Sequence, residues 1–548
     1  MRLTDHTGGF LQSLCLPVSG MPAKSLRPVL TVFWSKINVR FFGHIGLVTA
    51  TILSMACAPS APRPESNNPI PPQIHGFDGL LPDVEKVVLE NGMRVLVLPR
   101  PGIPTVSFVM QYGIGGIHER PGETGVAHLL EHMLFKGSEA IGTTDVAAER
   151  VLLDMIDELH EDVVAAHESG NLAEIEKLED EINRLEDQAR EFVVANEFDR
   201  ILSQAGARGL NATTTSESTI YFVELPANRA ELFFALEADR MANPVFREFY
   251  SERDVVMEER RMRVDASPRG TLYERHLSTA FRVHPYGQPV VGLMEDLRTL
   301  GRRDVERYYQ DYYGPNNAVL AVVGNVEADD VTAWARHYLG PIPERLDPPS
   351  VESLEPKQTE ERRVIIEWDA EPALRIGWHV PEATHDDAAA IAMLSVILTG
   401  GRTSRLHRRL VTDEQIAASV FSSTGPGNRF PQLFQVDVIP IHTASTETVE
   451  AAIYEEIKRI QDEGPSDEEL ERVRNQLEAG RVRRLQSNLG LAFQLADSES
   501  LFGDWTTTFK AAERMTEVDT DSVMRVARRY LNIENRTVGI LQRPSVSR

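Results

Sequence analysis

The sequence contains few cysteines, and both precede the part of the chain that has a globular composition. They are Cys15 and Cys57, two among 548 residues. The residues after Cys57 therefore have neither a disulfide nor a cysteine-bound metal site. Long hydrophobic runs are scarce as well. The apolar run at residues 45–58 is too short to span a bilayer comfortably, although it suits the hydrophobic region of a secretory signal.

Basic residues are outnumbered by acidic ones. The chain has 57 Lys+Arg against 82 Asp+Glu, a formal net charge of −25, which argues against a nucleic-acid partner. Half of that excess lies in residues 145–200, where 18 acidic residues stand against 5 basic ones, and we interpret it as a solvated surface. The hydrophobic content of 42% and the length leave room for two to four domains with a large core.

The first sixty residues have the features of an export signal. Six basic residues and one acid occur in residues 1–63, and the apolar run ends at Ala56-Cys57-Ala58. Signal peptidase can cut after Ala58, or Cys57 can become a lipidated N-terminus, because LSMAC resembles a bacterial lipobox. We expect export to the periplasm of a bacterium, or anchoring at its outer membrane through a lipid on Cys57 as the one membrane contact. A mitochondrial presequence is the weaker alternative.

Behind this leader, two halves of similar size follow each other. Each has strand signals, then helices, then a last strand; the first half opens with the hairpin signal Asn91-Gly92 and ends with the apolar run at residues 318–324. This order predicts an α+β fold of two homologous mixed α/β domains. The expected divisions are a leader and tether (1–61), a Pro-rich linker (62–83), an N-terminal domain (84–340), a second linker (341–360) and a C-terminal domain (361–548).

Residues 145–205 are expected to form a helical hairpin inserted in the N-terminal domain. Apolar residues recur there at alternating spacings of four and three, and the pattern is interrupted around Gly170. The acidic residues fall on the outer faces of the two helices. His160 and His167 lie on this segment, and we interpret both as solvated surface histidines.

The segment from Gly125 to His132 (GVAHLLEH) contains the pattern H-x-x-E-H. On a helix, His128 and His132 are four residues apart and share one face, so both can reach one metal ion. Glu131 projects beside them, where it can act as general base on a zinc-bound water whose pKa the metal lowers. This is the inverted form of the zincin motif, and it needs one more protein ligand. A histidine pair on an ordinary amphipathic helix is the plainer alternative.

Several further segments resemble one known family. They are GETGVAHLLEHMLFKGS (122–138), LNATT with TIYF (210–214 and 219–222), SERDVVMEE (251–259), HPYGQPVVG (284–292), YYGPNNAVLAVVGNV (312–326) and TGGRTSRLHRRL (399–410). In this order they resemble the insulinase, pitrilysin and mitochondrial processing peptidase family of zinc metallopeptidases. The resemblance extends over about residues 84–548 and implies a bacterial processing-peptidase-like subunit, with a metallopeptidase half and an inactive-like half.

The resemblance also implies which residues complete the metal site. It places the third zinc ligand at Glu259 and a supporting carboxylate at Glu252, seven residues earlier on the same face of a helix. Glu258 points about 100° away from that face. The second half lacks an H-x-x-E-H pattern, so we expect one zinc ion per chain.

The resemblance places two segments next to the substrate. The first contains Asn211, Ala212 and Thr214, with Asn211 hydrogen-bonded to the peptide; an Asn/Thr turn that leads into a strand is the alternative. The second is the strand at residues 103–112, which is expected to be an edge strand that takes the peptide by β-strand addition.

The sequence departs from the family at one place. Active single-chain members carry an Arg and a Tyr that contact the substrate, and here Val411 and Ala418 stand at those positions. Neither side chain can donate a hydrogen bond to an oxyanion. We therefore expect a zinc-dependent endopeptidase for peptides or short unfolded segments that needs a related partner subunit, in a heterodimer, to supply the pair. A catalytically weak scaffold or assembly subunit with a retained zinc site is the second hypothesis, and a small-molecule hydrolase is the third.

Overall fold

The structure is a computed structural model, and it describes residues 82–544. These residues all belong to one compact unit, Phe77–Arg548. The predicted leader and tether (1–61), with Cys57, and nearly all of the predicted Pro-rich linker (62–83) lie outside the described residues.

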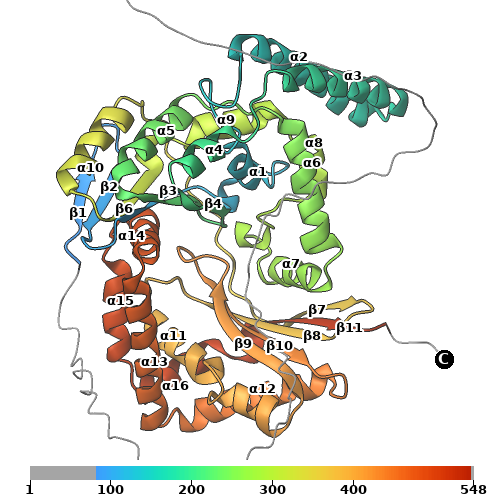
Figure 1. The fold of residues 1–548 in the computed structure, drawn as a ribbon. Coiled ribbons are helices and arrows are strands. Elements are labelled where there is room, and N and C mark those ends of the chain that lie inside the picture. The colour runs from blue at the N-terminus through green and yellow to red at the C-terminus, as the bar shows by residue number, and fades with distance from the viewer. Residues whose placement is uncertain (1–81, 545–548) are drawn as a thin grey trace, which may run out of the picture. The chain divides into compact units, whose positions relative to one another are not determined.

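The first half of the described chain is built on a six-stranded sheet (Figure 1). Its strands are β1 (Glu85–Val88), β2 (Arg94–Pro99), β3 (Thr105–Tyr112), β4 (Arg208–Thr214), β5 (Thr219–Pro226) and β6 (Ala318–Gly324). They lie in the order β1-β2-β6-β3-β5-β4. Only β2 and β6 run parallel, and every other neighbouring pair is antiparallel.

The second half repeats this topology on a five-stranded sheet. Its strands are β7 (Arg362–Glu367), β8 (Ala373–Val380), β9 (Ala417–Gly425), β10 (Gln432–Pro440) and β11 (Arg536–Gln542). Their order, β7-β11-β8-β10-β9, matches β2-β6-β3-β5-β4, and again only the first pair is parallel. The prediction of an α+β fold with two homologous halves is therefore confirmed. Residues 343–359 between the halves contain neither helix nor strand.

The prediction that residues 103–112 form an edge strand is wrong. Strand β3 pairs with β6 on one side and with β5 on the other. Its residues from Val106 to Tyr112 are all buried, as expected for an inner strand that is covered on both faces. The edge of this sheet next to β5 is β4, which carries Asn211, Ala212 and Thr214.

Helices cover both sheets. Those of the first half are α1 (Val126–Met133), α2 (Val146–Ser169), α3 (Leu172–Arg190), α4 (Glu197–Gln204), α5 (Ala230–Ala242), α6 (Phe249–Arg260), α7 (Pro268–Ala280), α8 (Met294–Thr299), α9 (Arg302–Tyr312) and α10 (Ala328–Trp334). Those of the second half are α11 (Ala388–Thr399), α12 (Thr446–Glu463), α13 (Asp467–Gln486), α14 (Asn488–Phe502), α15 (Thr507–Thr516) and α16 (Thr520–Tyr530).

Each half contributes one helix to the sheet of the other half. Helix α14 packs against β3 and β6 of the first sheet, where Leu495 joins a buried cluster with Val109 (Figure 1). Helix α7 packs against β7, β8 and β11 of the second sheet, and His276 Nε2 lies 3.1 Å from the carbonyl oxygen of Thr537. The packing of α14 on the first sheet and of α7 on the second sheet therefore joins the two halves, in addition to the chain that connects them.

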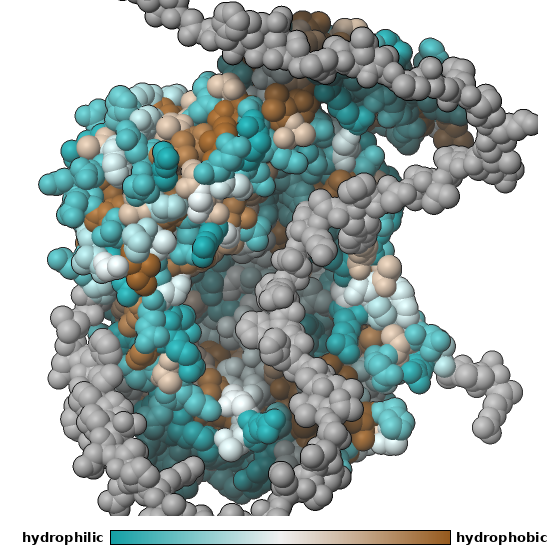
Figure 2. Space-filling model, viewed as in Figure 1, coloured by the Kyte–Doolittle hydropathy of each residue, from teal (hydrophilic) through white to brown (hydrophobic). Residues whose placement is uncertain are grey.

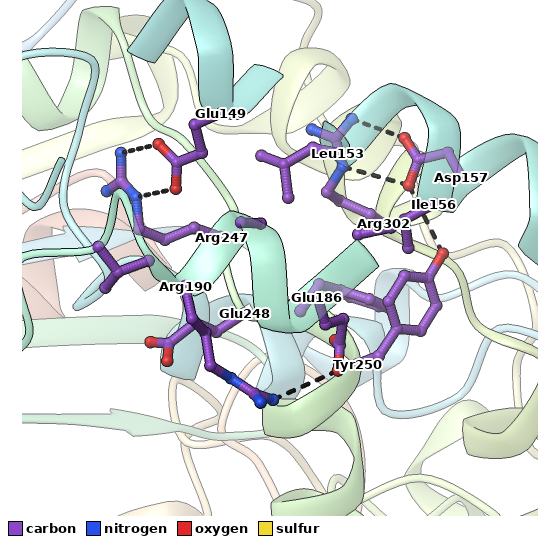
Figure 3. A pocket seen from close by; sticks show the side chains of 13 residues that line it. Glu149, Leu153, Ile156, Asp157, Glu186, Arg190, Arg247, Glu248, Tyr250 and Arg302 are labelled. Atoms are coloured by element: carbon purple, nitrogen blue, oxygen red, sulfur yellow. Dashed lines mark hydrogen bonds and ion pairs between the residues drawn. The ribbon is translucent and has the colours of Figure 1, made fainter. Parts of the chain in front are cut away.

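The helical hairpin α2–α3 is anchored on the first half by buried ion pairs. Arg247 Nε lies 2.9 Å from Glu149 Oε1, with side chains only 1% and 0% exposed, and Arg302 Nη2 lies 2.6 Å from Asp157 Oδ2. Figure 3 shows both pairs around a small pocket between the hairpin and the body. The acidic outer faces of the hairpin are directed to solvent, and its visible surface is mostly hydrophilic (Figure 2).

The interpretation of the hairpin histidines is correct for only one of them. His167 is exposed on α2. His160 is 6% exposed, because its face of α2 is turned toward the body, and its Nε2 lies 3.2 Å from the carbonyl oxygen of Thr299. Among all the described residues, no helix combines the length and the apolar character that a membrane crossing requires.

Candidate metal centre

Helix α1 begins at a position where only glycine fits. Gly125 has a φ of +91°, and a Cβ atom there would lie 2.9 Å from the Cα of Gly292. Glu119 satisfies two of the backbone N–H groups at the start of this helix, because its carboxylate accepts hydrogen bonds from Gly125 N and Ala127 N, each at 3.0 Å. The start of the helix is thus fixed, and with it the direction in which the next residues point.

The three residues of the motif lie on one face of α1. His128 is 8% exposed, and the centroids of the His128 and His132 rings are 5.0 Å apart at an angle of 78°. Helix α6 faces them with Glu259, whose Oε1 lies 3.8 Å from His128 Nε2 and whose Oε2 lies 3.6 Å from His132 Nε2. The structure therefore brings together the two predicted histidines and the predicted third ligand, with donor atoms within 4.8 Å of one another.

The donor set fits a zinc ion. Two imidazole nitrogens and one carboxylate leave a fourth position open, as catalytic zinc requires, and bonds of about 2.0–2.1 Å would separate tetrahedral ligands by about 3.3–3.4 Å. The observed separations are slightly longer. Burial, with smaller contributions from His132 and Arg263, lowers the pKa of His128 to about 3, so its ring is neutral near pH 7 and keeps a free lone pair.

Glu252 supports His132 from the side away from Glu259. Its Oε2 lies 3.4 Å from His132 Nδ1, and its Oε1 lies 2.5 Å from Lys136 Nζ. Lys136 also contacts Glu248 Oε2 at 3.1 Å. Burial by itself lowers the pKa of His132, but the Glu252 hydrogen bond and the nearby carboxylates outweigh it and raise that pKa. A partner on Nδ1 fixes the orientation of the ring and leaves Nε2 facing Glu259.

Glu131, the predicted base, is held by Thr214. The Thr214 hydroxyl donates a hydrogen bond of 2.5 Å to Glu131 Oε2. Burial raises the pKa of Glu131, and the Thr214 hydrogen bond opposes that shift in part. A carboxylate with a raised pKa accepts a proton more readily at neutral pH than an ordinary surface glutamate does.

The other predicted substrate residues follow β4 away from this contact. Asn211 is exposed, and its Oδ1 accepts a hydrogen bond of 2.9 Å from the backbone of Ala212. Ala212 is 8% exposed and packs into the core. Thr214 thus contacts Glu131, while Asn211 lies on the open edge of the sheet.

Two cations beside the candidate ligands were not predicted from the sequence. Lys136 follows His132 by four residues, and Arg263 follows Glu259 by four residues. Arg263 Nη1 lies 2.5 Å from Glu259 Oε1. The i to i+4 spacing was a usable signal, because it places two side chains next to each other on a helix.

The second half has apolar residues where the resemblance implied an Arg and a Tyr. Val411 packs against the hydrophobic core of the second half. Ala418 is an exposed residue of β9, which is an edge strand of the second sheet.

Two models of a single family match the chain. The model described as Insulinase (Peptidase family M16) matches residues 94–150 and 191–293, and the one described as Peptidase M16 inactive domain matches residues 299–477. Together they match more than half of the 548 residues, and the chain belongs to the insulinase family of peptidases, M16. The resemblance seen in the sequence is confirmed. The match leaves out residues 151–190, which form most of α2 and all of α3.

Relatives and solved structures agree with this assignment. The chain is 29% identical to Zinc protease PqqE of Helicobacter pylori over 352 residues, 62% of this chain and 67% of the relative. It is 25% identical to the crystal structure of a protease from Helicobacter pylori, with a TM-score of 0.72, covering 84% of this chain and all of that one. The periplasmic protease PqqL from Escherichia coli shares the fold, with a TM-score of 0.63, 18% identity and coverage of 84% of this chain and 48% of that one. The zinc protease names support a peptidase-like role and a zinc requirement.

Proposed function

We propose that this chain is a zinc-dependent endopeptidase that hydrolyses peptides or short unfolded segments. The observation that carries the proposal is the convergence of His128 Nε2, His132 Nε2 and a Glu259 carboxylate beside a fourth residue, Glu131, that is not needed as a ligand. A purely structural zinc site needs no free carboxylate of this kind.

The residues of the centre have separate roles in this proposal. A zinc ion held by His128, His132 and Glu259, one per chain, would polarise a peptide carbonyl and lower the pKa of water. Glu131 accepts the proton of the attacking water and passes it to the leaving amine. Thr214 holds the carboxylate of Glu131 in place, and the Glu252–Lys136 pair keeps His132 turned toward the site.

The peptide is proposed to add as a strand to the edge of β4. Asn211 is exposed on that edge, and the same strand ends at Thr214 on the base. We further propose that a related peptidase-like subunit completes the site in a heterodimer, since Val411 and Ala418 offer no hydrogen-bond donor. The fold of this chain matches 48% of the longer PqqL chain, which is compatible with a second unit of similar size.

Cleavage of a mixed peptide library by the purified, zinc-loaded full chain tests the proposal, with E131Q as the matched variant. We expect weak cleavage by the wild-type chain alone, stronger cleavage after a related partner chain is added, and none by E131Q in either case. Full activity of the purified monomer would disprove the need for a partner. Zinc binding without cleavage in any combination would favour the scaffold hypothesis.

Export is proposed on the sequence of residues 1–61, which lie outside the described residues. We propose that the chain is carried to the periplasm of a bacterium and tethered to its outer membrane by a lipid on Cys57. Metabolic labelling with a radioactive fatty acid is expected to mark the wild-type chain and not C57A. Equal labelling of both, or a chain found only in the cytoplasmic fraction, would contradict this.

A further inference from the structure

The short segment after Glu259 places a positively charged side chain, Arg263, beside the candidate metal centre. Helix α6 ends at Arg260 and continues as one wider turn, Arg261–Asp265, with π-helical hydrogen bonding. Such turns often occur at functional sites because they displace side chains from the regular helical positions. Arg263 lies in the middle of this turn, and its guanidinium is 2.5 Å from Glu259 Oε1.

Arg263 is placed to meet an incoming peptide. Its side chain is 64% exposed, whereas Lys136 at the same centre is 22% exposed and paired with two carboxylates. Its guanidinium contacts the same Glu259 carboxylate that faces His128 and His132, so its positive charge lies beside the proposed ligands. A guanidinium has five N–H donors in a planar fork, and one carboxylate oxygen does not use them all.

A neighbouring residue shows what an ordinary pair looks like on the same turn. Arg261 Nη1 lies 3.0 Å from Glu258 Oε2, and these side chains are 50% and 57% exposed. Such an exposed pair contributes little to stability. Arg263 differs because its partner Glu259 is only 14% exposed and belongs to the metal centre.

We propose that Arg263 is a specificity-determining residue that binds a carboxylate group of the peptide, next to the bond to be cleaved. The carboxylate can belong to an Asp or Glu side chain or to the C-terminus of the substrate, since both present the same planar pair of oxygens. This inference rests on the proposed peptidase function and names a substrate class for it, namely peptides that are acidic close to the cleavage site.

Peptide binding to the zinc-loaded full chain carrying E131Q tests the inference without any cleavage. The probes are short alanine-rich peptides in which one Asp is moved through every position. Each is paired with the Asn version, and each is made with a free and with an amidated C-terminus. The readout is the dissociation constant from fluorescence anisotropy. We expect one Asp peptide, or the free C-terminus, to bind about ten- to a hundredfold more tightly than its neutral counterpart, as expected for a charged hydrogen bond.

Three further variants in the E131Q background show whether Arg263 is responsible. R263Q is expected to bring this ratio close to one while zinc stays bound, R263K to keep part of it, and R261Q to leave it unchanged. A ratio that R263Q does not alter, or no preference for a carboxylate at all, would overturn the inference. Loss of zinc from R263Q would overturn it too, because Arg263 would then only hold Glu259. Absence of zinc from the E131Q parent would instead contradict the proposed function.

Discussion

Single contacts hold the carboxylates of the candidate metal centre. Thr214 donates to Glu131, and Lys136 lies against Glu252, which faces His132. Neither Thr214 nor Lys136 is among the three donors that converge on the proposed ion. Their effect is on orientation, and the loss of orientation is costly in catalysis because the reacting groups must be aligned.

Replacing Thr214 by valine removes the hydroxyl and keeps the shape of the side chain. We expect kcat/KM to fall about ten- to a hundredfold, the loss of one hydrogen bond to a charged group, with zinc content unchanged. T214S retains the hydroxyl and is expected to stay close to wild type. Peptide cleavage measures both variants, with the chain alone or with its partner chain, whichever preparation of the wild type is active. Equal rates for T214V and the wild-type chain would show that Glu131 needs no such support.

At the scale of single elements, the hairpin α2–α3 contacts the loop that follows α1. Arg247 pairs with Glu149 of α2 and donates hydrogen bonds to the carbonyl oxygens of Lys136 and Ser138, at 2.5 and 2.7 Å. These two residues lie in the loop that follows α1, which ends at Met133. Arg247 therefore connects the hairpin anchor to the loop that follows α1.

E149A leaves the Arg247 guanidinium buried without its carboxylate. We expect the free energy of unfolding to fall by about 3–5 kcal/mol, the usual result of breaking a buried pair. R150A is the matched control, because Arg150 and its partner Glu139 are 54% and 44% exposed and such pairs contribute about 0–1 kcal/mol. Urea unfolding of the full chain measures both. A loss below 1 kcal/mol for E149A would mean that the hairpin is not held by this pair.

The sequence predicted most elements, and the errors have physical causes. The hairpin signal at Asn91-Gly92 and the helical spacing in residues 145–205 depend on near neighbours, so they could be recognised. The position of β3 inside its sheet depends on its pairing with β6, about two hundred residues later, and no local pattern shows that. The burial of His160 depends in the same way on the packing of α2 against the body.

In the candidate site, too, local patterns predict some residues, and contacts between distant parts of the chain bring in the others. Spacing on helices placed His128, Glu131 and His132 on one face, and the resemblance supplied Glu259, which the structure brings to them. The contact of Thr214 with Glu131 joins residues 83 positions apart and could not be predicted from spacing.

For the whole molecule, the exchange of α7 and α14 makes the two halves depend on each other. His276 of α7 is fully buried against the second sheet, beside Thr537. Burial, with a smaller contribution from Arg375, lowers the pKa of His276 to about 3. Its value in the unfolded chain is about 6.5. Between these two values the unfolded state binds more protons than the folded state, so the free energy of unfolding decreases as the pH falls through that range.

The H276Q variant tests whether this buried histidine makes the stability of the interface between the halves depend on pH. Glutamine can still donate to the Thr537 carbonyl and cannot take up a proton. We expect the Tm of the wild-type chain to fall between about pH 6.5 and pH 4, and that of H276Q to fall less steeply. H167Q, at an exposed position of α2, is expected to follow the wild type. Parallel curves for H276Q and wild type would show that this interface does not sense the proton.

Native mass spectrometry of the full chain shows whether α1 and α6 together bind a zinc ion. We expect one zinc ion per chain in the wild type and in E131Q, and none in H132A or E259A. E258A, which changes the exposed neighbour of Glu259 on the same helix, is predicted to keep its zinc. Zinc retained by both H132A and E259A, or absent from the wild-type chain, would show that these residues do not form a zinc site.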